Sequence, residues 1–440
     1  MGHAEPQVAN ALESFWMPFS ANKEFKSEPR MFARAKGMYF YTPDGREVID
    51  ASAGLFCVAA GHCRQEIADA VYEQLQTLDF TAPFMRAHSK AFELAERITH
   101  YTPEGVNRVF FVNSGSESID TAMKMALAYH RVRGEPQRQI FISRERAYHG
   151  VNMGGVSLAG MVNNRRAFGL GLGGVHHMRH THLPENKFIS GQPENGADLA
   201  DDLQRFCALY GGENIAAVFV EPTAGSIGCL PPPKGYLNKL RAICDQHGIL
   251  LVFDEVITGW GRMGAPFAAQ AFGVTPDIMT MAKALTNGAQ PMGAVATKQA
   301  VYDTIINGGP KAGVEFFHGY TYSAHPAACA AGLAMMDIFA KERLVERAAA
   351  MSPRFMAAIH SLRDCPIVTD IRSIGMMAAV DVAMDGVPGN RGHEAQKRLY
   401  DAGLNLKATG DALIIAPPLV LEDKHIDEIV TKLRSVLQTL

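Results

Sequence analysis

Two short apolar runs each end in a single charged residue. The run at 250–253 (LLVF) precedes Asp254, and the run at 278–282 (IMTMA) precedes Lys283. A carboxylate that follows a buried strand is desolvated, so it requires a cationic partner or several hydrogen-bond donors. A lysine with little access to water has a lowered pKa, which favours the neutral nucleophile. An aspartate that keeps a ring nitrogen protonated and a lysine that forms a Schiff base with an aldehyde predict a pyridoxal 5'-phosphate (PLP) site.

A stretch of small residues at 113–117 (NSGSE) joins a predicted strand to a predicted helix. Small residues let the backbone N–H groups of a helix N-terminus face an anion, and the helix dipole favours negative charge there. Plain N-capping by Ser114 or Ser116 is the alternative. Because the aspartate and lysine are also present, the stretch predicts a phosphate site.

Three further side chains are candidates for contact with a flat cofactor ring. Tyr148 follows the predicted strand at 139–143 and could stack on the ring, although a single tyrosine is more often a packing residue. Glu221 ends another predicted strand, where it is either functional or caps a loop. Val256 would point to the same side of a strand as Asp254 and could pack beneath the ring.

Strand and helix signals alternate through the central part of the chain. Near-continuous apolar strands between helices indicate a mostly parallel sheet covered on both faces. Ligands of such sheets bind beyond the carboxyl ends of the strands, where Asp254 falls. The predicted strands are 108–113, 139–143, 216–221, 250–254, 278–282 and 292–297, and the predicted helices include 65–78, 90–99, 116–133 and 236–247.

The C-terminal part has a different pattern, with helices expected at 325–340, 344–362 and 423–437 and strand-like pieces at 367–373, 376–382 and 413–416. This pattern indicates a smaller α+β domain, completed by an N-terminal hairpin around Pro43-Asp44-Gly45. Residues 1–35 are expected to form an irregular arm or short helices. The predicted domains are 1–65 as part of the small domain, 66–330 as the large ligand-binding domain, and 331–440 as the C-terminal small domain.

Composition excludes several classes of protein. The chain has 440 residues, 47% hydrophobic and 20% charged, with a net charge of −3, so we expect neither nucleic-acid nor membrane partners. Seven scattered cysteines indicate reduced, buried thiols, and the N-terminus lacks the features of a signal peptide, so a cytoplasmic location is expected. His176, His177, His180 and His182 are predicted to lie in a polar loop rather than to bind a metal.

Taken together, the motifs resemble class III (ornithine/ω-amino-acid type) PLP-dependent aminotransferases of fold type I. Within that family the likeness is to the ω-amino acid:pyruvate (β-alanine:pyruvate) aminotransferases. It covers nearly the whole chain, through FWMPFSANKEF, AGHCRQEIADAV, NSGSE, AYHGVN, EPTAGSIGCLPPPKGYL, FDEVITGWGRMG, AKALTNGAQPMGAV and HGYTYSAHPAACAAGLA. Fold type I implies a large domain with a mostly parallel seven-stranded sheet covered by helices, and a smaller α+β domain from both ends of the chain.

The resemblance also implies a role for each matching residue. Lys283 corresponds to the lysine that binds the cofactor and moves the substrate proton, and Asp254 to the partner of the pyridine nitrogen. The remaining matches are Gly115 and Ser116 at the phosphate, Tyr148 and Val256 on opposite faces of the ring, Glu221 as an acid that orders the site, and Phe56, Phe84 and Tyr320 in the substrate pocket. Of these, Phe84 and Tyr320 are expected to reach the pocket from the neighbouring subunit. Thr321 matches a threonine that reaches the phosphate from the neighbouring subunit, which implies a homodimer or homotetramer with shared active sites.

Two departures from the family pattern concern the substrate. Relatives that act on ω-amino acids carry an arginine where this chain has Lys407, and a lysine lacks the planar fork for bidentate carboxylate binding. Phe56 stands where relatives often have tryptophan, which enlarges one side of the pocket.

These observations predict a ping-pong transaminase that takes an amino group from an ω-amino acid or a primary amine and gives it to pyruvate or a similar 2-oxo acid. Alternatives are a transaminase for amines without a carboxylate, another fold type I enzyme such as a decarboxylase or racemase, and a binding protein without activity.

Overall fold

The computed structural model describes residues 12–169 and 171–440. In this part of the chain, a seven-stranded sheet forms the centre of the molecule, in the order β4-β10-β9-β8-β7-β5-β6. The pairs from β9 to β6 are parallel, whereas β10 runs antiparallel to both β4 and β9. The strands are β4 (Val106–Val112), β5 (Ile140–Arg144), β6 (Val175–Met178), β7 (Ile215–Val220), β8 (Leu250–Asp254), β9 (Ile278–Met281) and β10 (Gly293–Lys298).

Helices cover both faces of this sheet, which explains the near-continuous apolar strands. In β8, Leu251 and Phe253 belong to one buried cluster, and Leu250 and Val252 belong to the cluster on the opposite face. The first cluster includes α4 (Ser89–Thr99), α8 (Asp201–Tyr210), α9 (Tyr236–His247) and α12 (Pro326–Lys341), with α3 (Gln65–Thr77) packed on α12. The second includes α5 (Gly115–Val132), α6 (Met153–Leu158) and α11 (Gln299–Asn307).

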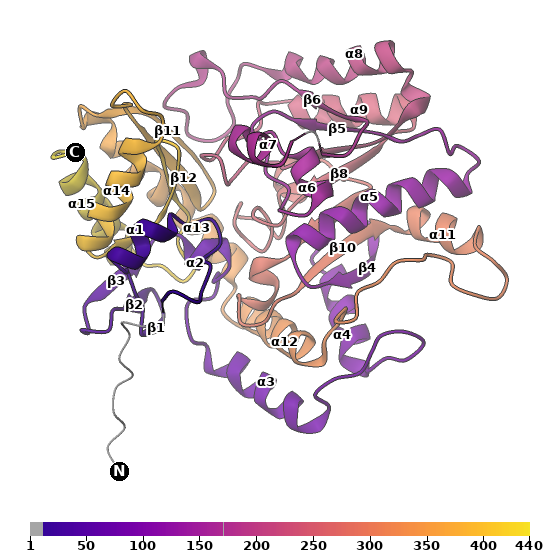
Figure 1. The fold of residues 1–440 in the computed structure, drawn as a ribbon, viewed down its shortest axis with the longest axis horizontal. Helices are drawn as coiled ribbons and strands as arrows, with labels where there is room; N and C mark the ends of the chain where they lie inside the picture. Colours follow the sequence, from indigo (N-terminus) through magenta and orange to yellow (C-terminus); the bar gives the residue numbers. More distant parts are fainter. Residues whose placement is uncertain (1–11, 170) are drawn as a thin grey trace.

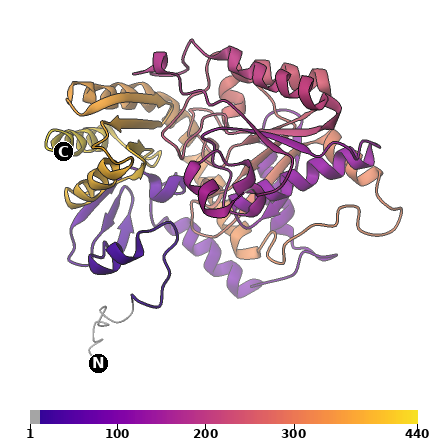
Figure 2. The same cartoon turned by 45° about the horizontal axis from the view of Figure 1, so that its top comes forward.

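The N-terminal strands at 34–50 and the C-terminal elements lie together beside the large sheet (Figure 1). One small sheet joins β1 (Arg34–Lys36), β2 (Tyr39–Tyr41) and β3 (Glu47–Asp50) to β13 (Leu404–Asn405), and β3 pairs with β13 in parallel. The other contains β11 (Val368–Ile374), β12 (Met377–Val382), β14 (Lys407–Thr409) and β15 (Ala412–Ile415). The helices α13 (Leu344–His360), α14 (Asn390–Asp401) and α15 (Asp423–Leu437) pack around them (Figure 2).

The remaining helices are α1 (Asn22–Ser27), α2 (Ala53–Phe56), α7 (Val162–Phe168) and α10 (Ala268–Phe272). The short helix α1 agrees with the expected N-terminal arm, although the part of that arm at 1–11 lies outside the described residues. No helix of the described chain is both long and apolar enough to cross a membrane.

The sequence interpretation is wrong about two of the histidines and two of the cysteines. His176 and His177 lie in β6 rather than in a loop, because the segment pairs with β5 and His176 stacks on Tyr210 with ring centroids 4.4 Å apart. The seven cysteines, all within the described part of the chain, are free, but Cys63 is exposed and Cys57 is only half-buried. The prediction of buried thiols is therefore confirmed for five cysteines and is wrong for Cys57 and Cys63.

Candidate active site

A cavity opens at the carboxyl edge of β5, β7 and β8, where the sequence placed a ligand site. It brings together predicted residues that are far apart in the chain: Gly115, Ser116, Tyr148, Glu221, Asp254, Val256 and Lys283. His149, Gly150, Ile257 and Ala282 complete its lining. The lining of the cavity therefore combines a helix N-terminus with a buried carboxylate and an amine.

Asp254 is the last residue of β8 and is buried. Its Oδ2 lies 2.8 Å from Nδ1 of His149, and its Oδ1 accepts hydrogen bonds from the Val256 amide at 3.1 Å and the Thr280 hydroxyl at 3.3 Å. These donors satisfy a carboxylate that would otherwise be unpaired in the interior. Val256 lies in the turn after β8 and not on the strand, so strand alternation was the wrong reason for its position beside Asp254.

His149 is the residue of this site that sequence reasoning missed. It is buried against Phe219, and its Nε2 has no hydrogen-bond partner within the described chain. The signal was present, since His149 follows Tyr148 in the loop after β5, but its partner Asp254 lies in β8 and is remote in sequence.

Lys283 begins a single 3-10 turn directly after β9 and has a φ of +50°. A left-handed backbone at a non-glycine residue costs about 1 to 2 kcal/mol, and such strain gathers at functional sites. Burial lowers the pKa of Lys283, whereas the nearby Cys57, Asp254 and Glu221 act in the opposite direction. The side chain is therefore closer to a neutral amine than a solvent-exposed lysine is.

The N-terminus of α5 also lines the cavity. Ser114 caps the helix by accepting a hydrogen bond from the Glu117 amide at 3.2 Å, so the N-capping interpretation is correct for Ser114. Gly115 and Ser116 instead line the cavity. A β-carbon on Gly115 would lie 2.9 Å from Val256, so only glycine permits this approach between the helix and the turn after β8.

Glu221 lies at the end of β7 and is buried. It accepts hydrogen bonds from the Tyr148 amide at 3.0 Å and the Gly225 amide at 3.2 Å, so it fixes the loop that carries Tyr148. Burial raises its pKa, an effect that His149 opposes. Burial also raises the pKa of Tyr148, so the phenol remains neutral over the ordinary pH range.

Phe56 and Lys407 extend the site beyond the cavity itself. The Phe56 ring is buried and lies near two amines, with its centroid 5.8 Å from Nζ of Lys283 and 5.9 Å from Nζ of Lys407. Burial, reinforced by the positive charge of Lys283, lowers the pKa of Lys407 to about 8. Lys407 is thus a cation that loses its charge in the mildly alkaline range.

The structure does not bring Phe84, Tyr320 or Thr321 to the cavity of their own chain. Phe84 and Thr321 are exposed, and Phe84 packs against Gly319, where a β-carbon would lie 3.1 Å from its ring. These three predicted residues therefore form a separate surface on two adjacent loops.

The cavity has the features that PLP requires. The carboxylate of Asp254 is suited to a protonated pyridine nitrogen, the amine of Lys283 to an aldehyde, and the helix N-terminus at Gly115 and Ser116 to a phosphate. A β-carbon at Gly150 would lie 2.5 Å from the Ser116 hydroxyl, so the Tyr148 loop reaches the helix end only because residue 150 is glycine.

Comparison with known proteins agrees with this assignment. The family model described as "Aminotransferase class-III" matches residues 20–437. An omega-aminotransferase of Caulobacter vibrioides is 53% identical over 98% of both chains, and an omega-amino acid–pyruvate aminotransferase of Pseudomonas putida is 46% identical over 100% of this chain and 99% of its own. The solved omega transaminase of Pseudomonas jessenii in complex with PMP has a TM-score of 0.92 at 34% identity and covers 97% of this chain and 96% of its own.

The fold and the site define a PLP-dependent enzyme of fold type I. The chain belongs to the class III aminotransferases, whose cofactor is PLP.

Proposed function

We propose that this enzyme transfers an amino group from an ω-amino acid of the β-alanine type, or from a primary amine, to pyruvate or a similar 2-oxo acid. The observation that carries the proposal is the placement of Asp254 and Lys283 at one cavity beside a helix N-terminus. The names of relatives 46–53% identical over the full chain, among them a β-alanine–pyruvate aminotransferase of Pseudomonas aeruginosa at 47%, support this choice of substrates.

When bound, PLP supplies an aldehyde that reacts with primary amines and a ring that withdraws electrons from the carbon being deprotonated. We assign Asp254 to hold the ring nitrogen protonated, with His149 as its hydrogen-bond partner. Lys283 would hold the aldehyde through its amine and move the proton from the substrate carbon. The lowered pKa of Lys283 supports this role, because a neutral amine is both nucleophile and base.

The other lining residues would hold the cofactor in place. Gly115 and Ser116 would bind the phosphate with backbone and hydroxyl donors, since they lie at the N-terminus of a helix of 18 residues. Tyr148 and Val256 would enclose the ring from its two faces, and Glu221 would keep the Tyr148 loop in place through the 3.0 Å bond to its amide.

We further propose that the active enzyme is a homodimer, or a homotetramer built from such dimers. Phe84, Tyr320 and Thr321 lie outside the cavity of their own chain, so a second copy of the chain would use them to complete the substrate pocket and the phosphate site. Phe56 and Lys407 would contribute to that pocket from the same chain as the lysine. Free thiols persist in a reducing compartment, which supports work in the cytoplasm.

An absorption experiment tests the reaction. The PLP-loaded enzyme should be yellow, and β-alanine alone should bleach the colour, which pyruvate should restore. Lys283→Ala should lose turnover by about 10⁴-fold or more, as expected when the group that both binds and transfers protons is removed. An enzyme that releases CO2 or racemises its donor without needing a 2-oxo acid would contradict the proposal.

A second candidate differs only in the donor. Lys407 has a pKa of about 8 and no guanidinium fork, which favours amines without a carboxylate. Parallel bleaching with β-alanine and 1-phenylethylamine distinguishes the two: exclusive bleaching by 1-phenylethylamine would assign the enzyme to the second class.

A further inference from the structure

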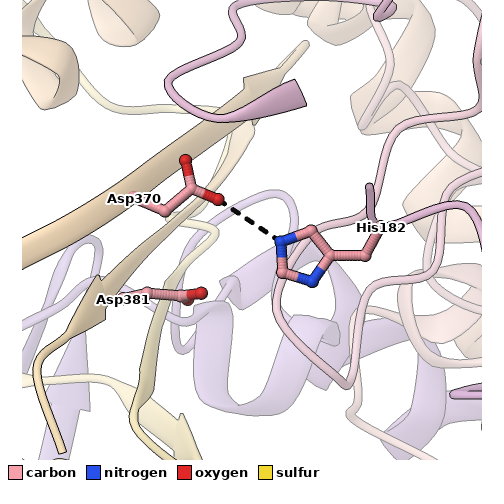
Figure 3. Close-up of side chains that lie close together, drawn as sticks. All are labelled: His182, Asp370 and Asp381. Atoms are coloured by element: carbon pink, nitrogen blue, oxygen red, sulfur yellow. Dashed lines mark hydrogen bonds and ion pairs between the residues drawn. The ribbon is translucent and has the colours of Figure 1, made fainter. Parts of the chain in front are cut away.

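Three potential metal ligands converge at the junction of the large sheet and the C-terminal sheet: His182, Asp370 and Asp381 (Figure 3). Their ligand atoms lie within 4.8 Å of one another. The buried guanidinium of Arg372 already lies among them. Its Nη1 donates to Asp370, lies 2.9 Å from Oδ2 of Asp381 and lies 3.4 Å from Nε2 of His182. A metal cation would be repelled at this point, so the cluster is an ion-pair network around Arg372.

The rest of the Arg372 guanidinium faces a different loop. Its Nε and Nη2 both donate to the carbonyl of Gly228, at 3.1 Å and 2.9 Å. A planar guanidinium that is held by two carboxylates has a fixed orientation, so its paired donors also fix the acceptor. The acceptor belongs to the segment at 222–230, which connects β7 to α9.

This segment contacts the proposed active site at two places. The Gly225 amide donates to Glu221 at 3.2 Å. The Ser226 carbonyl accepts from the Thr409 hydroxyl at 2.8 Å and from Nζ of Lys407 at 3.4 Å. Lys407 and Thr409 lie on the same side of β14, as residues two apart on a strand do. Gly228 is two residues from Ser226, so displacement of its carbonyl would be transmitted to the Lys407 ammonium.

We propose that Arg372 is a positioning residue for substrate specificity. Its hydrogen bonds to the Gly228 carbonyl keep the Ser226 carbonyl in place, and the Ser226 carbonyl orients the Lys407 ammonium toward a donor carboxylate. The inference rests on the proposed function, in which Lys407 lies in the substrate pocket. It assigns the ion-pair network a role in choosing among donors, which a purely structural clamp would not have.

Arg372→Lys is the primary test, because it keeps a positive charge between Asp370 and Asp381 but cannot donate a fixed pair of hydrogen bonds to Gly228. Single-turnover bleaching of the PLP-loaded enzyme by donor alone excludes pyruvate from the comparison. The concentration of β-alanine for half-maximal rate should rise about five- to tenfold, the loss expected for one hydrogen bond of ordinary strength, while the value for 1-phenylethylamine changes little. Arg354→Lys, in an exposed ion pair with Asp427, is the matched control.

A second readout follows Lys407 without using activity. Reductive methylation of the protein, quantified at Lys407 by mass spectrometry across pH, should show a higher midpoint pH in Arg372→Lys than in the wild type, because the ammonium becomes better hydrated. If both donors are affected equally and the midpoint does not move, Arg372 is structural and the proposal is overturned. If neither donor bleaches the wild type but the midpoint still moves, the proposed function fails while the positioning is upheld.

Thr409→Val keeps the proposal testable if Arg372→Lys does not fold. It removes the 2.8 Å bond to the Ser226 carbonyl and leaves the ion pairs of Arg372 with Asp370 and Asp381 in place. It should raise the half-maximal concentration of β-alanine selectively, and Thr409→Ser should restore it. A Thr409→Val enzyme with wild-type kinetics for β-alanine would overturn the proposal.

Discussion

His149 and Asp254 form a buried pair at the scale of single residues, with 2.8 Å between Nδ1 and Oδ2. When Nδ1 carries a proton, it donates a hydrogen bond to the Asp254 carboxylate and holds it in position for a cationic ring nitrogen. Since Thr280 and the Val256 amide donate to the other oxygen, His149 is the sole described donor to Oδ2.

His149→Phe should therefore weaken PLP binding by about 10- to 100-fold, the loss expected for one hydrogen bond to a buried charge. Equilibrium dialysis of the apoenzyme against PLP measures the change. His130→Asn is a suitable control, because His130 is also buried and bonded to Ala216 but lies away from the cavity. Equal losses in both variants would indicate a general effect of removing a buried histidine.

Lys407 makes donor choice depend on pH. With a pKa of about 8, it is charged below pH 8 and neutral above it. The half-maximal concentration of β-alanine, divided by that of 1-phenylethylamine, should be flat below pH 8 and rise about tenfold per unit above it. The effect of Lys283 titration cancels in this ratio, because it is the same for both donors. In Lys407→Arg the ratio should be lower and independent of pH, because guanidinium remains charged. A flat ratio in the wild type would exclude Lys407 as a carboxylate ligand.

At the scale of elements, the loop after β5 and the N-terminus of α5 must approach closely to form the phosphate end of the cavity. Gly150 has a φ of +95°, and a β-carbon there would lie 2.7 Å from the Ser116 backbone. Gly134 has a similar φ of +81° but open space around it. Alanine substitutions at these two positions therefore distinguish the effect of backbone strain alone from the added effect of a steric clash.

Gly134→Ala should lower the free energy of unfolding by about 1 to 2 kcal/mol and leave PLP binding unchanged. Gly150→Ala should cost more stability and should also weaken PLP binding, since the Tyr148 loop must move away from Ser116. Thermal unfolding of the apoenzyme and dialysis with PLP check the two effects. Wild-type PLP affinity in Gly150→Ala would show that this contact does not shape the site.

The elements with strong local patterns were predicted well, and those that depend on distant partners were not. The helices at 236–247 and 423–437 match α9 and α15 because capping and apolar periodicity are local. The strand β6 was missed because its VHHM segment has two polar residues and is stabilised by pairing with β5. The strand β13 is two residues long and exists through its pairing with β3. No local pattern could indicate either.

In the candidate site, too, some residues could be placed from local sequence patterns and others could not. Asp254, Glu221 and Ser116 end strands or begin a helix, so their place at the carboxyl edge of a sheet was predictable. The φ of +50° at Lys283 and the His149–Asp254 contact depend on how several loops pack together. They follow from tertiary structure and not from any pattern in the sequence.

At the scale of the whole molecule, we propose that 66–330 fold as a large domain and that 1–65 and 331–440 together form the small one. The parallel pairing of β3 with β13 supports the union of the two ends, as does the separation of the small sheets from the large one. The hydrogen bonds from Arg372 to the Gly228 carbonyl would then fasten the two domains to each other beside the active site.

The surface that carries Phe84, Tyr320 and Thr321 also leaves large apolar side chains in solvent. Met85 is 98% exposed and Phe317 is 88% exposed, although both are apolar. Contiguous exposed apolar side chains mark interaction surfaces, and a second copy of the chain is the partner that the proposed shared site requires.

Charge placed on this surface should therefore separate the subunits and stop catalysis together. In analytical ultracentrifugation the wild type should sediment as a dimer or tetramer, while the double variant Met85→Asp/Phe317→Asp should shift to monomer and lose at least about 100-fold in turnover, as expected when catalytic groups are no longer positioned. Val387→Asp adds a charge at another exposed apolar side chain, 60% accessible, and should change neither property. Because Lys283 and Asp254 are untouched in the monomer, a monomeric double variant with full activity would show that each chain contains a complete active site.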